Sequence, residues 1–492
     1  MASLLALPLV AITGALAFSY PQIPADRTTP FQQRIAVKGA NSISVGWNTF
    51  QKLDQPCVQF GISSSSLTAQ SCSTDSYTYA SSRTWSNAVT LSGLQPATTY
   101  FYKIVSTNST VQSFFSPRAA GDDTPFNMDV VVDLGVYGPD GFTTTKRDTI
   151  PQIEPALEHS TIGSLARTYK DYELVIHPGD FAYADDWFLK PQNLLDGKDA
   201  YSAILETFYN QLAPISALKP YMAGPGNHEA ACEEINYTSG LCPQGQKNFT
   251  DFRNRFNQTL GTAFLSSSND SSAQHSAVIA KALANPPFWY SFEYGQAHVV
   301  MFNTETDFPK APDGKDGSAN LNAGPFGATG QQLAFLEADL SSVDRTVTPW
   351  LIVAAHRPWY STGGKGNVCA PCQAAFEPLF YKYGVDLALF GHVHNSQRFS
   401  PIYNGTVDPA GLNNPKAPMY VVAGGAGNIE GLSEAGANAT GNVFTYDGDF
   451  SYARVKVMDA NNLGVEFYNS RNDTLLDSSV LYKAHAEQFV VQ

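Results

Sequence analysis

The chain is short of positive charge. It carries 30 Lys and Arg residues against 44 Asp and Glu residues, which leaves a formal net charge of −14 over 492 residues. A surface of this sign repels the backbone of nucleic acids and anionic lipid headgroups, so neither is expected as a general partner. It would also repel a small anionic substrate, unless a local cationic centre such as a metal ion reverses the sign.

Long apolar runs are also scarce. The exception is Met1–Ala17, which reads MASLLALPLVAITGALA. Its apolar stretch is too short to span a bilayer, and Ala15-Leu16-Ala17 is typical of a signal-peptide cleavage site, although the segment begins without Lys or Arg. A buried N-terminal strand is the alternative. We predict a signal peptide over residues 1–17 and a secreted protein, because no other run could cross a membrane and the C-terminus lacks an anchor tail.

Cysteine is infrequent, with six residues in the whole chain. They fall into three close pairs, and although six cysteines allow 15 connectivities, we predict local pairing. The pairs are Cys57/Cys72, Cys232/Cys242 and Cys369/Cys372. A thioredoxin-like redox motif is the alternative for the last pair. Glycosylation sequons, which suit a secreted chain, occur at Asn108, Asn236, Asn248, Asn257, Asn269, Asn404, Asn438 and Asn472.

The length favours two or three domains. After the signal peptide, residues 18–123 are expected to form an all-β sandwich and a linker, because SISVGWNT and AVTLSGL alternate apolar and polar residues. Tyr100, just after Leu94-Gln-Pro, resembles the tyrosine corner of fibronectin type III domains, with Trp47 in the core. Residues 124–492 are expected to form one α/β domain, completed by the β-like tail SYARVKVMDANNLGVEFYN.

Five short apolar segments of the second region end in polar residues. They read NMDVVVDLG, YELVIHPGD, KPYMAGPGN, TPWLIVAAH and VDLALFGHVH. Helical spacing separates some of them, at Tyr201–Leu218 and at 328–340, and we interpret 236–272, rich in polar residues, as a decorated surface insertion. The carboxyl ends of strands in α/β sheets are where functional sites form, so these polar residues are expected to converge.

Each polar residue taken alone also has a purely structural explanation. Asp180 in GDFAY could cap a helix, Asn227-His228 could form a turn, and the pair His392/His394 could end a strand without binding anything. The set is more informative, because five strand ends offer oxygen and nitrogen donors and no thiolate. Seven such donors exceed a four-coordinate site and predict two ions. The seven are Asp133, Asp180, Tyr183, Asn227, His356, His392 and His394.

The order VDLG, GDFAY, GNHE, AAHRP and GHVH resembles the metallophosphoesterase superfamily, and Tyr183 narrows the resemblance to purple acid phosphatases. It extends from about Pro30 to Lys483 and includes the glycine-rich segment Met419–Asn428. The resemblance implies a four-layer α/β/β/α sandwich behind a separate N-terminal fibronectin III-like sandwich. It also implies a secreted acid phosphatase that hydrolyses phosphate monoesters through metal-activated hydroxide.

The ligand roles follow from the same resemblance. Asp133, Tyr183 and His394 would bind a ferric ion; Asn227, His356 and His392 would bind a divalent ion, namely iron, zinc or manganese; Asp180 would bridge the two. Asn227 and His228 would contact substrate. His228 is a hypothetical general acid oriented by Glu229, and binding of phosphate oxygen without proton transfer is its alternative.

Two positions depart from the family pattern. Val132 stands where the first motif usually has glycine, and plant members have a histidine pair in the loop that here contains Lys365. Lys365 could supply a positive charge to substrate or could be an ordinary surface lysine. Phytate is a candidate substrate, since a subset of the family hydrolyses it, and Lys365 and Arg357 are the nearby cations for its rim.

Three other functions remain open at this point. A phosphodiesterase or nucleotidase of the same superfamily would share most ligands, an iron pair could run peroxide chemistry, and a degenerate site would leave a binding module. Tyr183 argues against the first, and a complete set of seven donors argues against the last. Small phosphate esters are the expected partners, and the oligomeric state is not readable from the sequence.

Overall fold

The computed structural model describes residues 20–137, 161–189, 198–232, 242–264, 266–314, 325–363, 368–437 and 439–492. The signal-peptide prediction, Lys365 and the sequons at Asn236 and Asn438 therefore lie outside the described residues. None of the described helices has the length and apolar character needed to cross a membrane.

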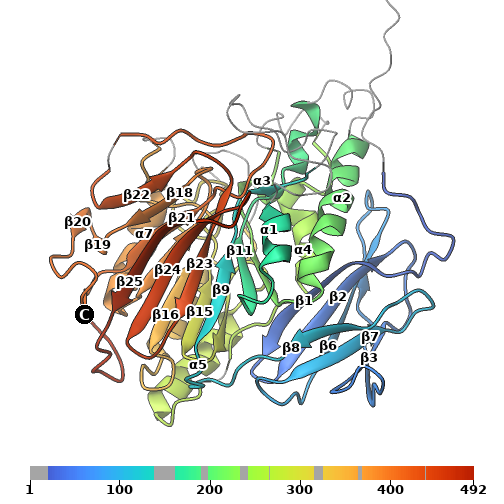
Figure 1. The fold of residues 1–492 in the computed structure, drawn as a ribbon, viewed down its shortest axis with the longest axis horizontal. Coiled ribbons are helices and arrows are strands. Elements are labelled where there is room, and N and C mark those ends of the chain that lie inside the picture. The colour runs from blue at the N-terminus through green and yellow to red at the C-terminus, as the bar shows by residue number, and fades with distance from the viewer. Residues whose placement is uncertain are drawn as a thin grey trace, which may run out of the picture.

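The N-terminal region folds into two four-stranded antiparallel sheets, as its alternating pattern predicts (Figure 1). Trp47 and Tyr102, one from each sheet, are fully buried. The Tyr100 hydroxyl accepts the backbone N–H of Gln95 at 3.0 Å, which is the hydrogen bond expected of a tyrosine corner. One sheet contains β1 (Phe31–Gly39), β2 (Ser42–Thr49), β6 (Trp85–Leu91) and β5 (Ser76–Tyr77). The other contains β4 (Ala69–Cys72), β3 (Cys57–Gly61), β7 (Thr99–Ile104) and β8 (Gln112–Phe115).

The sandwich packs tightly against the second region. The Tyr102 hydroxyl donates to the carbonyl of Ala217 at 2.8 Å, and the Arg34 guanidinium donates to the carbonyl of Arg255. Both side chains are buried, and the apolar core runs without interruption from one region into the other. The two regions consequently share one core.

The second region is built on two larger sheets. The six-stranded sheet has the order β13 (Tyr221–Gly224), β11 (Leu174–Pro178), β9 (Phe126–Val130), β23 (Ser451–Val457), β24 (Asn462–Asn469) and β25 (Leu475–Tyr482). The seven-stranded sheet has the order β14 (Tyr290–Tyr294), β15 (Ala297–Met301), β16 (Trp350–Ala354), β17 (Leu387–Phe390), β21 (Met419–Ala423), β18 (Ser396–Phe399) and β22 (Asn442–Tyr446). Short pairs are β10 (Leu134–Gly135) with β12 (Phe181–Ala182) and β19 (Ile402–Tyr403) with β20 (Thr406–Val407).

The two sheets meet face to face and helices cover their outer faces. Ser396 of β18 and Ser451 of β23 share a hydrogen bond of 2.8 Å between the sheets. Helix α1 (Thr161–Arg167) contacts β23 through Ser164, and α6 (Gln331–Ser341) contacts β14 through Asp339. The other helical segments are α2 (Lys198–Ser216), α3 (Asn227–Ala230), α4 (Thr250–Phe256), α5 (Ser271–Leu283), α7 (Ala370–Lys382), η1 (Ala184–Leu189) and η4 (Lys247–Phe249). The predicted α/β/β/α layering is confirmed.

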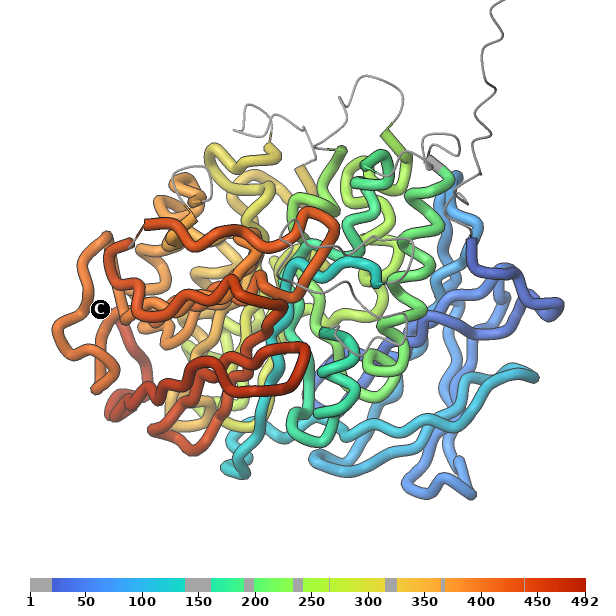
Figure 2. The backbone as a smooth tube through the Cα atoms, turned by 45° about the horizontal axis from the view of Figure 1, so that its top comes forward, coloured from blue at the N-terminus to red at the C-terminus, as the bar shows by residue number. Residues whose placement is uncertain are grey.

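The C-terminal strands complete the six-stranded sheet, as expected from their alternating pattern. Strand β23 pairs antiparallel with β9, about 325 residues earlier in the chain, and Arg454 of β23 binds Asp129 of β9 at 2.6 Å. Figure 2 shows the red C-terminal strands lying beside the cyan segment that contains β9. Pairing with β23 therefore fixes the position of β9, the strand that leads into the VDLG segment.

One prediction about the insertion is wrong. The segment 236–272 was expected on the surface, but α4 places Phe252 and Phe256 in the core, where both lie within 5.8 Å of the Phe181 ring centroid. Phe181 follows Asp180 directly, so α4 packs against the GDFAY segment that contains a predicted metal ligand. Its sequons at Asn248, Asn257 and Asn269 are exposed, as are those at Asn108, Asn404 and Asn472.

Candidate metal centre

All five predicted strand ends point to one place, although they belong to two sheets. Strands β9, β11 and β13 lie in the six-stranded sheet, and β16 and β17 lie in the seven-stranded sheet. The candidate site forms where the carboxyl ends of these two strand sets meet. All seven predicted ligand side chains lie in this region, and all are buried or nearly so.

The backbone is strained at four of the predicted ligands. Asp133, Asp180, Tyr183 and His392 have positive φ angles of 63°, 59°, 53° and 67°. Left-handed conformations cost non-glycine residues free energy and tend to cluster at functional sites, where the surrounding fold enforces them. Each residue turns the chain sharply as a strand ends, which directs its side chain into the gap between the sheets.

One group of donors surrounds Asn227. The Asn227 Oδ1 atom lies 2.9 Å from His356 Nε2 and 3.0 Å from His392 Nδ1. The carboxylate of Asp180 also reaches this group, with its Oδ2 atom 3.0 Å from His356 Nε2. Donor atoms of Asp180, His356 and His392 all lie within 4.8 Å of one another, as the ligands of a single cation would.

A second group gathers on the other side of Asp180. The Tyr183 hydroxyl lies 2.9 Å from His394 Nε2 and donates to Asp180 Oδ2 at 3.3 Å. Asp180 Oδ2 thus faces both groups. Because His392 is left-handed, the two histidines of GHVH straddle the groups instead of pointing the same way, which is the second of the two arrangements that the motif allows.

Asp133 supplies the test of whether cations fit here. Both of its carboxylate oxygens are fully buried without an ordinary hydrogen bond, and the nearest ionisable nitrogen is His356 Nδ1 at 3.8 Å. Burial and the Asp180 carboxylate raise the pKa of Asp133 well above its ordinary value. A buried carboxylate of this kind calls for a positive charge, so the site fits bound metal ions.

The electrostatics of Tyr183, His392 and His394 are also consistent with bound metal ions. Burial, Asp133 and Asp180 raise the pKa of Tyr183 well above 10, so the phenolate is disfavoured. Only a strongly polarising cation would stabilise the phenolate enough to be bound by it. Burial, together with the Arg357 guanidinium, lowers the pKa of His392, and burial lowers that of His394. Both shifts favour the neutral imidazole that metal ligation requires.

The structure gives His228 a different partner from the one expected. Its Nδ1 atom lies 2.9 Å from both carboxylate oxygens of Asp185, a residue that sequence reasoning missed although it stands in the same GDFAYAD segment. Glu229 instead accepts backbone N–H groups from Gly226, Asp180 and Phe181 at 2.8–2.9 Å. Glu229 therefore braces the metal-motif turns, and the hydrogen bonds point to Asp185 as the residue that orients His228.

Electrostatics at His228 favour the protonated ring. Burial opposes the charged form, but Asp185 and then Asp180 outweigh it and hold its pKa well above the ordinary value. The outward Nε2 atom lies 3.8 Å from Glu430 Oε1 and 3.9 Å from Asp180 Oδ2. Glu430, which follows the glycine-rich strand end, was also missed from the sequence.

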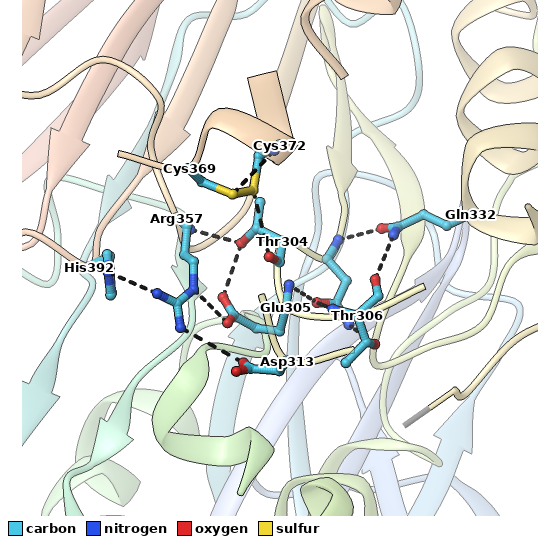
Figure 3. Close-up of a disulfide and its surroundings, with 10 residues drawn as sticks. Thr304, Glu305, Thr306, Asp313, Gln332, Arg357, Cys369, Cys372 and His392 are labelled. Atoms are coloured by element: carbon cyan, nitrogen blue, oxygen red, sulfur yellow. Dashed lines mark hydrogen bonds and ion pairs between the residues drawn. A yellow bond between two sulfur atoms is a disulfide. The ribbon is translucent and has the colours of Figure 1, made fainter. Parts of the chain in front are cut away.

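Arg357 does not lie on an open rim. Its Nε atom donates to buried Glu305 at 2.7 Å, and its Nη1 atom donates to His392 Nε2 at 3.1 Å. Figure 3 shows Arg357 between His392 and the Glu305–Asp313 side. Arg357 is thus engaged by protein groups and does not serve as the predicted surface cation.

The three predicted disulfides are confirmed. The bonds Cys57–Cys72, Cys232–Cys242 and Cys369–Cys372 are all present. The Cys369–Cys372 bond lies at the start of α7 beside Thr304, whose hydroxyl accepts the backbone N–H of Arg357 at 2.8 Å (Figure 3). Val132, the departure in the first motif, is fully buried, and a side chain at Gly391 would collide with it.

Comparison with known proteins decides the family. The chain is 62% identical to Acid phosphatase A of Cryphonectria parasitica, over 99% of this chain and 98% of that protein. The chain belongs to the purple acid phosphatase family. Family models match at residues 30–118 (purple acid phosphatase, N-terminal domain), 152–396 (calcineurin-like phosphoesterase) and 417–478 (iron/zinc purple acid phosphatase-like protein C).

More distant relatives agree with the family. An acid phosphatase of Aspergillus ficuum is 28% identical over 80% of this chain and 75% of its own length. The solved purple acid phosphatase from yellow lupin seeds shares the fold, with a TM-score of 0.65 and 23% identity, covering 93% of this chain and 75% of that chain. The sequence-based predictions of a metal-dependent acid phosphatase and of its fold are confirmed, and the iron/zinc family implies a binuclear metal centre.

Proposed function

We propose that this purple acid phosphatase hydrolyses phosphate monoesters at a pair of ions held by the seven converging residues. Asp133, Tyr183 and His394 would hold a ferric ion, and Asn227, His356 and His392 a divalent ion, either iron, zinc or manganese. Asp180 would bridge them, which is supported by the position of its Oδ2 atom between His356 and Tyr183. When bound, the ions would neutralise substrate charge and lower the pKa of water enough to make it a nucleophile at acidic pH.

The observation that carries the ferric assignment is the burial of Tyr183. Its phenolic oxygen meets His394 and Asp180 in a pocket that disfavours an uncompensated phenolate. A hard trivalent ion is the partner that such an anionic oxygen donor suits best. The test is a visible spectrum with metal analysis: a broad band in the middle of the visible range, lost in Tyr183→Phe, is expected. A fully active, colourless protein with two zinc ions would contradict the assignment.

The chain's own residues would bind the ester and move one proton. Asn227 and His228 would contact the phosphoryl group, and Lys365, outside the described residues, is a third candidate. Attack of water forms one P–O bond and breaks the bond to the alcohol, whose oxygen takes a proton from His228 Nε2. Asp185, bound to His228 Nδ1, would keep the ring oriented and charged. Glu229 would act through the turns that it braces.

The acid role of His228 can be separated from plain phosphate binding. His228→Ala should lose more rate on esters with poor leaving groups than on p-nitrophenyl phosphate, because a poor leaving group needs the proton most. Equal losses on both kinds of ester would leave only a phosphate-binding role. Asp185→Asn should reproduce the same pattern in weaker form.

A phosphodiesterase or nucleotidase activity is the alternative, because the calcineurin-like model covers both kinds of chemistry in one fold. Rates on p-nitrophenyl phosphate and on its bis ester discriminate the two, and faster hydrolysis of the bis ester would favour the alternative. Phytate remains a candidate monoester. The engagement of Arg357 by Glu305 removes one of the two cations proposed for its rim, so phytate hydrolysis would depend on Lys365.

Secretion is part of the same proposal. Three disulfides and six exposed sequons among the described residues suit an exported glycoprotein. Mass spectrometry of the secreted protein should find an N-terminus near Phe18 and glycans at exposed sequons. An intact Met1 on active protein would contradict the signal-peptide prediction.

A further inference from the structure

The outer face of His392 meets an unusual partner. A histidine that ligates a metal commonly donates its second ring N–H to a carboxylate or a carbonyl, which raises the basicity of the ligating nitrogen. Here the outer nitrogen, Nε2, receives an N–H from the Arg357 guanidinium at 3.1 Å. A guanidinium can only donate, so the partner behind the ring is a full positive charge and not a carboxylate or a carbonyl.

Nδ1 is the nitrogen that faces the centre. It lies 3.0 Å from Asn227 Oδ1, in the same group of donors as His356. Arg357 thus opposes the binding of a cation at Nδ1, because it places a positive charge behind the ring.

The guanidinium is held in this position by buried acids. Glu305 is fully buried and accepts from Arg357 Nε at 2.7 Å, while Asp313 Oδ2 lies 3.8 Å from Nη2. The Arg357 backbone is fixed as well, through its N–H bond to the Thr304 hydroxyl. Figure 3 shows the arrangement, with Glu305 and Asp313 on one side of Arg357 and His392 on the other.

Topology explains why these groups meet. Strands β15, β16 and β17 are parallel neighbours, and Glu305, Arg357 and His392 follow them in that order at the same edge of the sheet. An acid, a cation and a histidine therefore follow one another along this edge. His394 and Tyr183 lie on the other side of Asp180, away from this row.

We propose that Glu305 and Arg357 form a positioning pair for His392 that holds the affinity of the divalent-metal position below what its own ligands would provide. The inference rests on the proposed role of His392 as a divalent-metal ligand. The charge of Arg357 weakens cation binding beside His392, and the charge of Glu305 limits that weakening.

The test is a charge cycle read by zinc affinity. Protein carrying its visible band would be titrated with Zn²⁺ in competition with a fluorescent chelator, and the band would report that the Tyr183 side is intact. Arg357→Met should bind Zn²⁺ about tenfold more tightly and Glu305→Gln about tenfold more weakly, the scale typical of changes behind metal ligands. The double variant should return close to the parent, and Arg357→Lys, which keeps the charge, should stay near it.

A matched control separates this effect from the loss of any ion pair. Arg118 binds Glu173 with two hydrogen bonds of 2.9 and 2.6 Å at the opposite end of β11 from Asp180. Arg118→Met should leave zinc affinity unchanged. Weaker binding in both Arg357→Met and Glu305→Gln, or no change in either, would overturn the proposal. If the parent protein binds no zinc and shows no band, the proposed function fails instead.

Discussion

Two clusters of buried charge in the same domain are built in opposite ways. At the metal centre, Asp133 has no ordinary hydrogen-bond partner for either oxygen. Elsewhere in the domain, Asp386, next to the start of β17, accepts from Arg345 at 2.6 Å and from the backbone of Leu351 at 2.9 Å, with Lys483 at 3.4 Å. In the second cluster the protein supplies the cations, although Asp386 Oδ1 accepts no hydrogen bond, whereas Asp133 has no Lys or Arg beside it among the described residues.

The comparison separates function from stability. Burial of Asp386 is compensated by protein cations, so its pKa lies well below the ordinary value despite desolvation. At Asp133, burial and the neighbouring Asp180 outweigh the opposing effect of His228, so its pKa rises. A buried carboxylate in this position is stabilised when a cation is bound beside it.

Asp133→Asn should have the largest effect. With ions supplied, phosphatase turnover should fall by at least about 10³-fold, because a ligand worth several kcal/mol is lost. After chelation, the variant should unfold at the same or a higher urea concentration than chelated parent, since an uncompensated buried acid is gone. Chelated parent should itself lose turnover. A chelated variant that is several kcal/mol less stable would show that Asp133 is compensated by the protein.

Asp386→Asn should give the opposite pattern. It leaves Arg345 buried without its counter-ion, and the free energy of unfolding should fall by about 3–5 kcal/mol while turnover per folded molecule is kept. Because the folded pKa is depressed, the parent's advantage should be complete above the unfolded pKa of about 3.9 and shrink progressively as pH falls from there toward the folded pKa. Urea unfolding of both proteins across pH 2–7, a range set by that reference value, measures this. An advantage independent of pH would contradict it.

A third cluster of buried charge surrounds His298, a group of the opposite sign. His298 Nε2 lies 2.9 Å from Asp339 and Nδ1 lies 3.8 Å from Glu293; burial opposes its charge, but Asp339 raises its pKa to about 9. Its contribution, on the order of 3 kcal/mol, should be complete below the unfolded pKa of about 6.5 and lost as pH rises through about 9. The stability difference between parent and His298→Asn should therefore shrink at alkaline pH. A difference that grows with pH would indicate a neutral ring.

The smallest expected effect concerns the link beside the centre. Replacing Cys369 and Cys372 with alanine opens a bridge between residues three positions apart and should lower stability by about 2 kcal/mol. Because this bridge lies beside Thr304, zinc affinity should change as well. The pair Cys57/Cys72 in the N-terminal sandwich provides the control, for which stability falls and zinc affinity stays constant. Equal zinc affinity in both double variants would separate the disulfide from the metal centre.

Much of this site could be predicted from sequence because it depends on local order. The motifs from VDLG to GHVH each end a short apolar run, so strand ends and donor types were readable, and short spacings made the disulfide pairing predictable. The misassignments concern side chains whose partners lie far along the chain. Glu229 was expected to orient His228, but Asp185 contacts that ring and Glu229 binds backbone N–H groups. Arg357 was expected at the rim of the site, but its guanidinium is bound by buried Glu305.

The chemical groups can be identified in the amino-acid sequence: seven donors, their order, and the strands that end in them. The division of those strands, three in one sheet and two in the other, depends on long-range packing, because β9 pairs with β23 across about 325 residues. Strand pairing over that distance depends on which surfaces bury each other, and no local pattern records it. The same packing holds four predicted ligands in left-handed turns: Asp133, Asp180, Tyr183 and His392. It also buries the Asp133 carboxylate without a hydrogen bond, in a position suited to a bound cation.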